Sequence, residues 1–133
     1  ALMLYDGKIM ADVVDARATP DDDIALFSQD SVNSGTFYHA SMAYVGGATS
    51  SMTLSVDGLL QGSGTDTFSF GAGEFDIASI GATTNSGLWN LFNGLIDEVI
   101  IYNEALSIET NRNHFCALEA LAGTNPLSSV CTD

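Results

Sequence analysis

Two adjacent carboxylates, Asp97 and Glu98, lie inside the longest strand-like run of the chain, FNGLIDEVIIYNEALS at residues 92–107. Apolar residues fill both faces of a strand between Leu95 and Tyr102, and successive side chains point to opposite faces. A strand that is apolar on both faces is normally covered on both, so the pattern predicts a central strand. At least one of the two carboxylates then enters an apolar layer, where it must be paired, hydrogen-bonded or bound to a metal.

Asp97 is the candidate metal ligand. A hard cation such as Ca²⁺ takes about 6–8 oxygen ligands from carboxylates and main-chain carbonyls, and an acid held near the edge of a sandwich can supply one. The alternative is a carboxylate satisfied by main-chain N–H groups. The three consecutive aspartates at residues 21–23 lack the spacing of a calcium loop, and they predict a solvated loop instead.

Catalytic chemistry has no support in the residue pattern. Hydrolysis by two carboxylates needs an acid and a nucleophile about 5 Å apart, and Glu74 and Asp76 are followed by Ser79 where a further acid would be required. The two histidines, His39 and His114, stand far apart in the sequence and outside any zinc-ligand spacing. No G-x-S-x-G motif pairs a nucleophile with a base. The sequence therefore predicts a protein that is not an enzyme, with no catalytic residues.

Trp89, with Asn85 and Asn90 beside it, is the candidate ligand-binding group. An aromatic face stacks on the C–H groups of a sugar, while amides bond its hydroxyls. The alternative is that Trp89 fills one end of the fold as a structural side chain.

The charge balance restricts the possible partners. Three Lys and Arg residues against seventeen Asp and Glu residues give a net charge of −14, which disfavours nucleic acid and anionic membranes and favours cations. Solubility in a salty exterior is the simpler explanation of this acidity. No apolar run approaches the ~20 residues that cross a bilayer, so we expect no membrane insertion. The start of the chain lacks the pattern of an export signal, so we expect a mature form, a fragment or a domain of a larger protein.

The two cysteines, Cys116 and Cys131, are 15 residues apart, with a Gly-Thr-Asn-Pro turn between them. This turn could fold one cysteine back onto the other, and a disulfide would indicate an oxidising, extracellular setting. The alternative is a pair of free, buried cysteines.

Short strands separated by glycine-rich turns make up most of the chain. Asp6-Gly7 and Asp57-Gly58 each stand between apolar runs and predict tight hairpins. Ser107 is a suitable N-cap for a helix at residues 107–122, which Gly123 ends. We therefore expect one all-β domain over residues 1–133, an antiparallel β-sandwich with one short C-terminal helix at 107–122 that closes one end and a disulfide-tethered tail at 123–133.

A family resemblance appears in the same residues. FNGLIDEVIIYNEALS resembles the closing strand of laminin G-like, concanavalin A-like jelly-roll domains. TFYHASMAYVGGATSSMTLSVDGLLQGSG and DIASIGA resemble strands that precede it in that family. The resemblance covers about residues 35–121 and implies a jelly-roll β-sandwich, with a structural Ca²⁺ held by Asp97. The family's opening strands and their aspartates have no counterpart here, so the sandwich is expected to be incomplete at its N-terminus.

The resemblance implies a non-catalytic extracellular recognition or adhesion module that binds glycan or protein through the sandwich loops. The alternative function is a structural subunit of an extracellular filament or larger surface assembly, in which strands from a neighbouring chain complete the sheets. The expected partners are then a glycan, a surface protein or identical subunits, and not nucleic acid.

Overall fold

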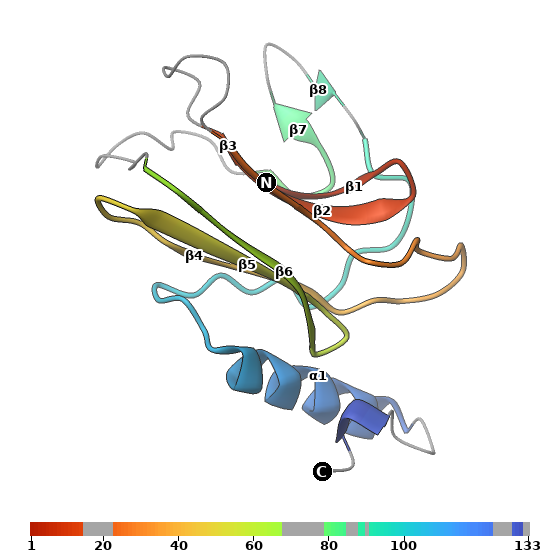
Figure 1. Cartoon of the computed structure of the whole chain (residues 1–133). Coiled ribbons are helices and arrows are strands. Elements are labelled where there is room, and N and C mark those ends of the chain that lie inside the picture. Colours follow the sequence, from red (N-terminus) through yellow and green to blue (C-terminus); the bar gives the residue numbers. More distant parts are fainter. Residues whose placement is uncertain (15–22, 68–78, 85–87, 90, 124–128, 132–133) are drawn as a thin grey trace.

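Two three-stranded antiparallel sheets face each other in the computed structural model, and a helix lies beyond the second sheet (Figure 1). The structure describes residues 1–14, 23–67, 79–84, 88–89, 91–123 and 129–131. The first sheet contains β1 (Leu2–Tyr5), β2 (Lys8–Val14) and β3 (Asp23–Phe27), and the second contains β4 (Ala40–Val45), β5 (Ser50–Val56) and β6 (Leu59–Asp66). A small hairpin of β7 (Thr83–Thr84) and β8 (Leu88–Trp89) follows. The predicted all-β sandwich is confirmed.

Both predicted Asp-Gly hairpins are present. Asp6 and Gly7 join β1 to β2 with φ values of 48° and 74°, and Asp57 and Gly58 join β5 to β6 with 50° and 73°. Positive φ at both central positions is the geometry of a type I′ turn, whose twist matches that of the flanking strands.

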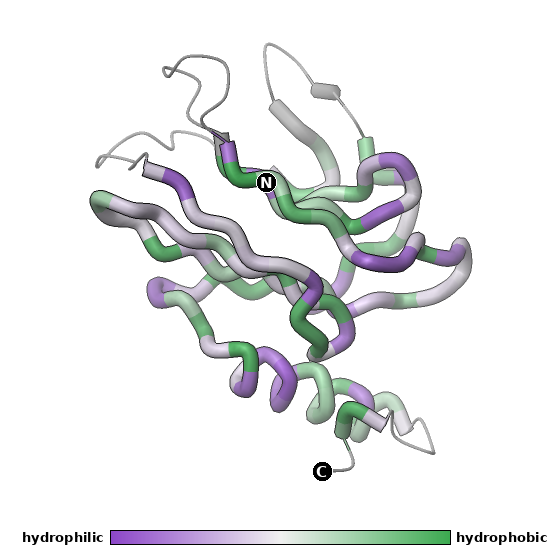
Figure 2. Tube along the Cα trace, viewed as in Figure 1, coloured by the Kyte–Doolittle hydropathy of each residue, from purple (hydrophilic) through white to green (hydrophobic). Residues whose placement is uncertain are grey.

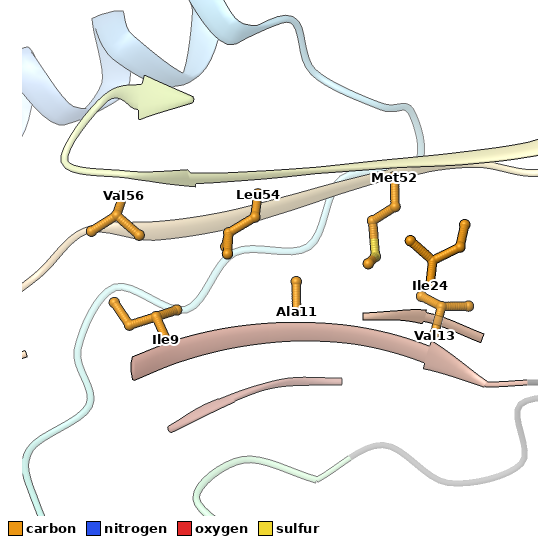
Figure 3. Close-up of a cluster of buried hydrophobic side chains, with 7 residues drawn as sticks. All are labelled: Ile9, Ala11, Val13, Ile24, Met52, Leu54 and Val56. Carbon is orange, nitrogen blue, oxygen red and sulfur yellow. The ribbon is translucent and has the colours of Figure 1, made fainter. Parts of the chain in front are cut away.

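The core lies between the two sheets. Figure 3 shows Ile9, Ala11 and Val13 of β2 pointing toward Met52, Leu54 and Val56 of β5. These residues are spaced by two along each strand, which places them on one face. Ile24 of β3 completes the cluster, and Met52 and Leu54 are at most 1% exposed. The sequence itself shows this alternation of apolar residues along both strands.

The second sheet approaches β3 closely at a point where β6 carries a glycine, Gly64, and a side chain would collide. A Cβ atom on Gly64 would lie 2.7 Å from Cγ2 of Ile24, well inside van der Waals contact. One on Gly62 would meet Leu26 at an ordinary 3.6 Å. Gly64 is therefore required for the separation of the two sheets at this point.

The prediction of a central strand at residues 95–102 is wrong for this structure. Residues 91–107 form neither strand nor helix, and the large apolar side chains at 91–102 are exposed. The buried central strand of the second sheet is β5, which pairs with β4 on one side and β6 on the other. A strand that is apolar on both faces is buried only if other parts of the protein pack against both faces. No described strand runs beside this segment, so its apolar side chains are not buried.

Other predicted boundaries shift or lie outside the described residues. The alternating residues at 37–45 predict a strand, and the strand begins only at Ala40. The sequence also predicts short strands at 68–70 and 75–80, which lie outside the described residues except for Ser79 and Ile80, and these two are not in a strand. Residues 81–91 are predicted as a long loop, and this stretch contains the β7–β8 hairpin.

The helix α1 (Ile108–Ala122) begins and ends as predicted. The Ser107 hydroxyl accepts a hydrogen bond from the Thr110 N–H at 3.1 Å, and Gly123 ends the helix with a left-handed φ of 68°. Phe115 is buried and packs next to the β5–β6 turn. The packing is close, since a Cβ atom on Gly58 would lie 3.1 Å from Phe115 Cδ1.

The predicted disulfide joins Cys116 of α1 to Cys131 of the short 3₁₀ helix η1 (Ser129–Cys131), with Cα atoms 5.5 Å apart.

Figure 2 shows apolar residues on both sheets and also along the stretch that leads to α1. In the described part of the chain, no helix has the length and hydropathy needed to cross a membrane.

Candidate functional site

Residues 91–102 form the most unusual surface of the described chain, and we call them the 91–102 segment. Large apolar side chains along it are 43–85% exposed: Leu91, Phe92, Leu95, Ile96, Val99, Ile100, Ile101 and Tyr102. Taking ~180 Å² for a fully exposed large side chain, these fractions leave on the order of 900 Å² of mostly apolar surface. The largest apolar patch of a typical monomer measures ~300–600 Å², and a standard protein interface buries ~800 Å² per partner. Summed over both sides of the segment, this exposed area is comparable to the area that one partner buries in a standard interface.

Among the described residues, the main chain of the 91–102 segment has almost no hydrogen-bond partners. The Phe92 N–H donates to the Gly81 carbonyl at 2.8 Å, and no other main-chain hydrogen bond joins residues 91–102 to the described residues. Glu98 has a left-handed φ of 51°, which is uncommon for a residue with a long side chain. This residue interrupts the extended backbone in the middle of the segment.

Asp97, the predicted calcium ligand, is exposed on this segment. Its Oδ1 accepts a hydrogen bond from the Glu98 N–H at 2.9 Å, which is the kind of main-chain bond that the alternative interpretation expected. Within the described ranges, no three His, Cys, Asp or Glu side chains are grouped to hold a metal ion. The described residues alone do not make a calcium site around Asp97, and the metal stays a prediction.

The predicted carbohydrate surface is only partly placed by the structure. Trp89 lies in β8, where it is paired with Thr83. Its side chain and the residues Asn85 and Asn90 lie outside what the structure describes. Sugar binding at these three residues stays a prediction.

The two histidines, far apart in the sequence, face the same boundary between the second sheet and α1. His39 precedes β4 and its ring lies 6.1 Å from the ring of Phe115, measured between centroids. The His39 N–H donates to Asp57 Oδ1 at 2.8 Å, and the Asp57 N–H donates to the His39 carbonyl, also at 2.8 Å. The Asp-Gly turn therefore does more than reverse the chain, because its aspartate also fixes the residue before β4.

The surroundings of this pair shift two pKa values. Burial lowers the pKa of the His39 imidazole below its ordinary value of 6.5; Asp57 opposes this shift and His114 adds to it. Burial raises the pKa of the Asp57 carboxyl, and the hydrogen bond from His39 opposes that change. Both groups are thus shifted toward their neutral forms, as expected where desolvation disfavours charge.

Three buried polar atoms near this boundary have no hydrogen-bond partner in the structure. They are His39 Nδ1, Ser41 Oγ and Ser55 Oγ. Ser41 and Ser55 are directly opposite each other on β4 and β5, and alternation places them on the sheet face of His39 and Asp57. Neither serine hydroxyl bonds to the imidazole, so these groups do not make the nucleophile–base contact that acyl transfer uses.

The 91–102 segment reaches α1 through its last residue. The hydroxyl oxygen of Tyr102 lies 3.4 Å from His114 Nδ1, and the two rings are stacked with centroids 5.7 Å apart. A shallow cleft of about 280 Å³ lies between the β5–β6 turn and the start of α1. It is lined by Gly58, Leu59, Leu60, Ile108, Glu109 and Arg112. This volume is at the lower end of ligand pockets, which measure about 300–1,000 Å³.

Sequence reasoning missed the proximity of the two histidines and the exposure of residues 91–102. No periodicity could bring His39 and His114 together, because their proximity depends on where α1 packs. The proximity of Asp57 and His39 could have been predicted from the sequence. The register of the β4–β5 hairpin, extended to the Asp57-Gly58 turn, places the two residues opposite each other.

Comparison with known proteins identifies relatives of this fold. A family model for laminin G-like domains, described as the concanavalin A-like lectin/glucanases superfamily, matches residues 4–110. The match begins within β1, so it includes the N-terminal hairpin that the sequence resemblance did not reach. No curated protein matches the chain.

A solved structure with a similar fold is the 2.1 Å crystal structure of an S-layer domain-containing protein from Clostridium thermocellum. Its sequence is 24% identical, the TM-score is 0.51, and the alignment covers 83% of this chain. The alignment covers 52% of that chain, so this protein spans about half the length of the solved structure.

Proposed function

Because the chain belongs to the concanavalin A-like lectin/glucanase superfamily as a laminin G-like domain, we propose that it is a non-catalytic extracellular recognition module whose ligand is a protein. The observation that carries this proposal is the exposure of eight large apolar side chains along the 91–102 segment. Apolar patches of this size mark protein interaction sites.

The chemistry of the segment favours a protein over a glycan. A sugar is held by an aromatic face together with amides, carboxylates or hydroxyls that bond its hydroxyl groups. The exposed residues of the segment include Leu95, Val99 and Ile101. These side chains are aliphatic, so they have no aromatic face and no polar group for a sugar hydroxyl. They do match the apolar centre of a protein interface, where removal of surface from water supplies much of the free energy of binding.

The disulfide supports the extracellular part of the proposal. Disulfides persist in secreted proteins and on cell surfaces and are rare in the reducing cytosol of most organisms. Cys116 and Cys131 are the only cysteines in the sequence, and both are in this bond.

Selection from a displayed library of random peptides tests the proposal. Peptides enriched on the wild-type chain should bind the double variant Leu95→Ser/Ile101→Ser at least tenfold more weakly, because two exposed apolar contacts are lost. The variant Leu121→Ser is the matched control, since Leu121 is 83% exposed at the far end of α1. A glycan array that gives strong binders, together with no peptide enrichment, would contradict the proposal and support the sugar surface at Trp89, Asn85 and Asn90.

A structural subunit of an extracellular filament or surface assembly is the second candidate function. The main chain of the 91–102 segment has almost no partners in the part of the chain that the structure describes, which favours this candidate, because a neighbouring chain could supply a strand beside it. The similar solved structure carries the name of an S-layer domain-containing protein, and that name describes the other protein. Light scattering after size exclusion separates the candidates: polymers that grow with protein concentration support the assembly, and a monomer at all concentrations contradicts it.

A further inference from the structure

We infer that the 91–102 segment binds by strand addition, and that its partner is an extended, basic segment of a different protein rather than a second copy of this chain. The inference rests on the proposed function, protein recognition, and specifies the mode of binding and the chemistry of the partner.

The composition of the 91–102 segment does not match its exposed surroundings. From Leu95 to Tyr102 the apolar residues alternate on both faces around Asp97 and Glu98, the pattern of a strand that is covered on both faces. In the structure these side chains are exposed instead. A partner strand alongside the segment would bring side chains to both faces at once, because its own side chains also alternate.

The main-chain groups of the 91–102 segment also favour strand addition. Apart from the bond between Phe92 and Gly81, the main-chain groups of residues 91–102 have no main-chain partners among the described residues. An extended peptide that lies alongside these groups can form a ladder of N–H to carbonyl bonds with them, with specificity from the side chains. Strand pairing would also return Glu98 from its left-handed φ of 51° to the β region, where long side chains are unstrained.

The charge of the 91–102 segment indicates the charge of its partner. Asp97 and Glu98 stand at the centre of the segment, on opposite faces of an extended chain. If two copies paired antiparallel about this centre, the carboxylates of one copy would lie opposite those of the other, and like charges directly opposite destabilise a strand pair. Each copy also has a net charge of −14. Lys or Arg at the centre of the partner removes both penalties, which selects a basic segment of another protein.

Synthetic peptides provide the probe. The first is a ten-residue peptide with a central Lys-Lys pair, flanked by alternating Val and Thr. The second has Glu-Glu at the centre. The third is the Lys-Lys peptide with every second main-chain nitrogen methylated, which removes hydrogen-bond donors and leaves the side chains in place. Affinity is measured by fluorescence anisotropy, and amide hydrogen exchange reports which main-chain groups become protected.

The expected result is saturable binding of the Lys-Lys peptide, with protection of amides within residues 95–102. The Glu-Glu and methylated peptides should each bind at least tenfold more weakly. The variant Asp97→Asn/Glu98→Gln should lose about threefold to tenfold in affinity for the Lys-Lys peptide, and its binding should depend less on salt. Leu121→Ser is again the control, and it should bind like the wild type.

Several outcomes would overturn the inference. Absence of protection in residues 95–102 by the Lys-Lys peptide contradicts strand addition. Equal binding of the methylated peptide also contradicts it, while protein recognition through side chains stands. Equal or tighter binding of the Glu-Glu peptide contradicts the basic partner. The proposed function itself fails only if the peptide library yields no ligand that depends on Leu95 and Ile101, so the two failures are distinguishable.

Discussion

β5 and the 91–102 segment are both extended and rich in apolar residues, but they lie in opposite environments. In β5, Ser50, Met52, Leu54 and Ser55 are at most 1% exposed, and hydrogen-bonded strands flank it on both sides. In the 91–102 segment, Leu95 is 78% and Ile101 is 85% exposed. The difference lies in the connections: β5 is joined to both of its neighbours by short turns, whereas the segment is followed by α1 and has no hairpin partner among the described strands. Composition determines what a strand needs, and connectivity determines whether the same chain provides it.

The largest expected effect is a difference in stability when leucine is replaced by alanine in β5 and in the 91–102 segment. Leu54→Ala should lower the free energy of unfolding by about 2–5 kcal/mol, because it opens a cavity in the core. Leu95→Ala should change it by less than about 0.5 kcal/mol, because the side chain is already in water. Urea unfolding of both variants measures this. A cost at Leu95 comparable to that at Leu54 would show that the segment is buried in solution.

A smaller effect is expected from the close packing of β6 against β3. Gly64→Ala should destabilise the fold by about 1–3 kcal/mol, because the new methyl group would overlap Ile24 and force the sheets apart. Gly62→Ala on the same strand is the matched control, since its methyl group would make an ordinary contact with Leu26. If the two variants unfold at the same urea concentration, Gly64 is not needed for the separation of the sheets.

Acidification should weaken the boundary between the second sheet and α1. The pKa of His39 is lowered in the fold, so folding favours the neutral ring. Its contribution is complete above the unfolded pKa of 6.5 and is lost as the pH falls through the lower folded value. Because the ring is only half-buried and solvent screens the charge, the loss should stay below ~1 kcal/mol.

Urea unfolding at a series of pH values measures this loss. His39→Gln should remove the fall in stability, while His114→Gln should keep it. The raised pKa of Asp57 acts in the opposite direction at lower pH, because a protonated carboxyl is favoured in the fold. A stability that rises as the pH drops from 7 toward 6 would contradict the assignment to His39.

The smallest expected effect on stability sharpens the comparison most directly. Ile101→Ser should leave the midpoint of thermal unfolding unchanged within error, because Ile101 is 85% exposed. The same substitution should clearly reduce binding of a fluorescent dye that reports exposed apolar surface, whereas Val56→Ala in β5 should lower the midpoint. Unchanged dye binding in Ile101→Ser would mean that the apolar surface of the native state lies elsewhere.

Local signals in the sequence were sufficient for much of the fold. The Asp-Gly pairs at residues 6–7 and 57–58 predict their hairpins because few residues tolerate two positive φ values in succession. Ser107 marks the start of the helix because its hydroxyl accepts a hydrogen bond from a main-chain N–H of the first turn. Gly123 marks the end because glycine adopts the left-handed φ without strain. The cysteines were correctly paired because only one pairing within the chain exists.

The candidate site depended on contacts that the sequence does not encode locally. The motif at residues 92–107 correctly identified the family, yet its burial was predicted wrongly because burial depends on a partner strand distant in sequence or in another molecule. The family match also extends to residue 4, through a hairpin whose residues are typical of many β proteins. The surroundings of His39 depend on the packing of α1 and could not be derived from periodicity.

The 91–102 segment is attached near both of its ends, by the Phe92–Gly81 hydrogen bond and by the Tyr102–His114 contact. A span of chain with fixed ends samples far fewer conformations than a free tail of the same length. The conformational entropy that a partner must remove on binding is correspondingly smaller, which favours affinity without any additional contact. Because Tyr102 attaches the segment to α1, the affinity of the segment for its partner depends on α1 being folded. This holds although α1 itself need not touch the ligand.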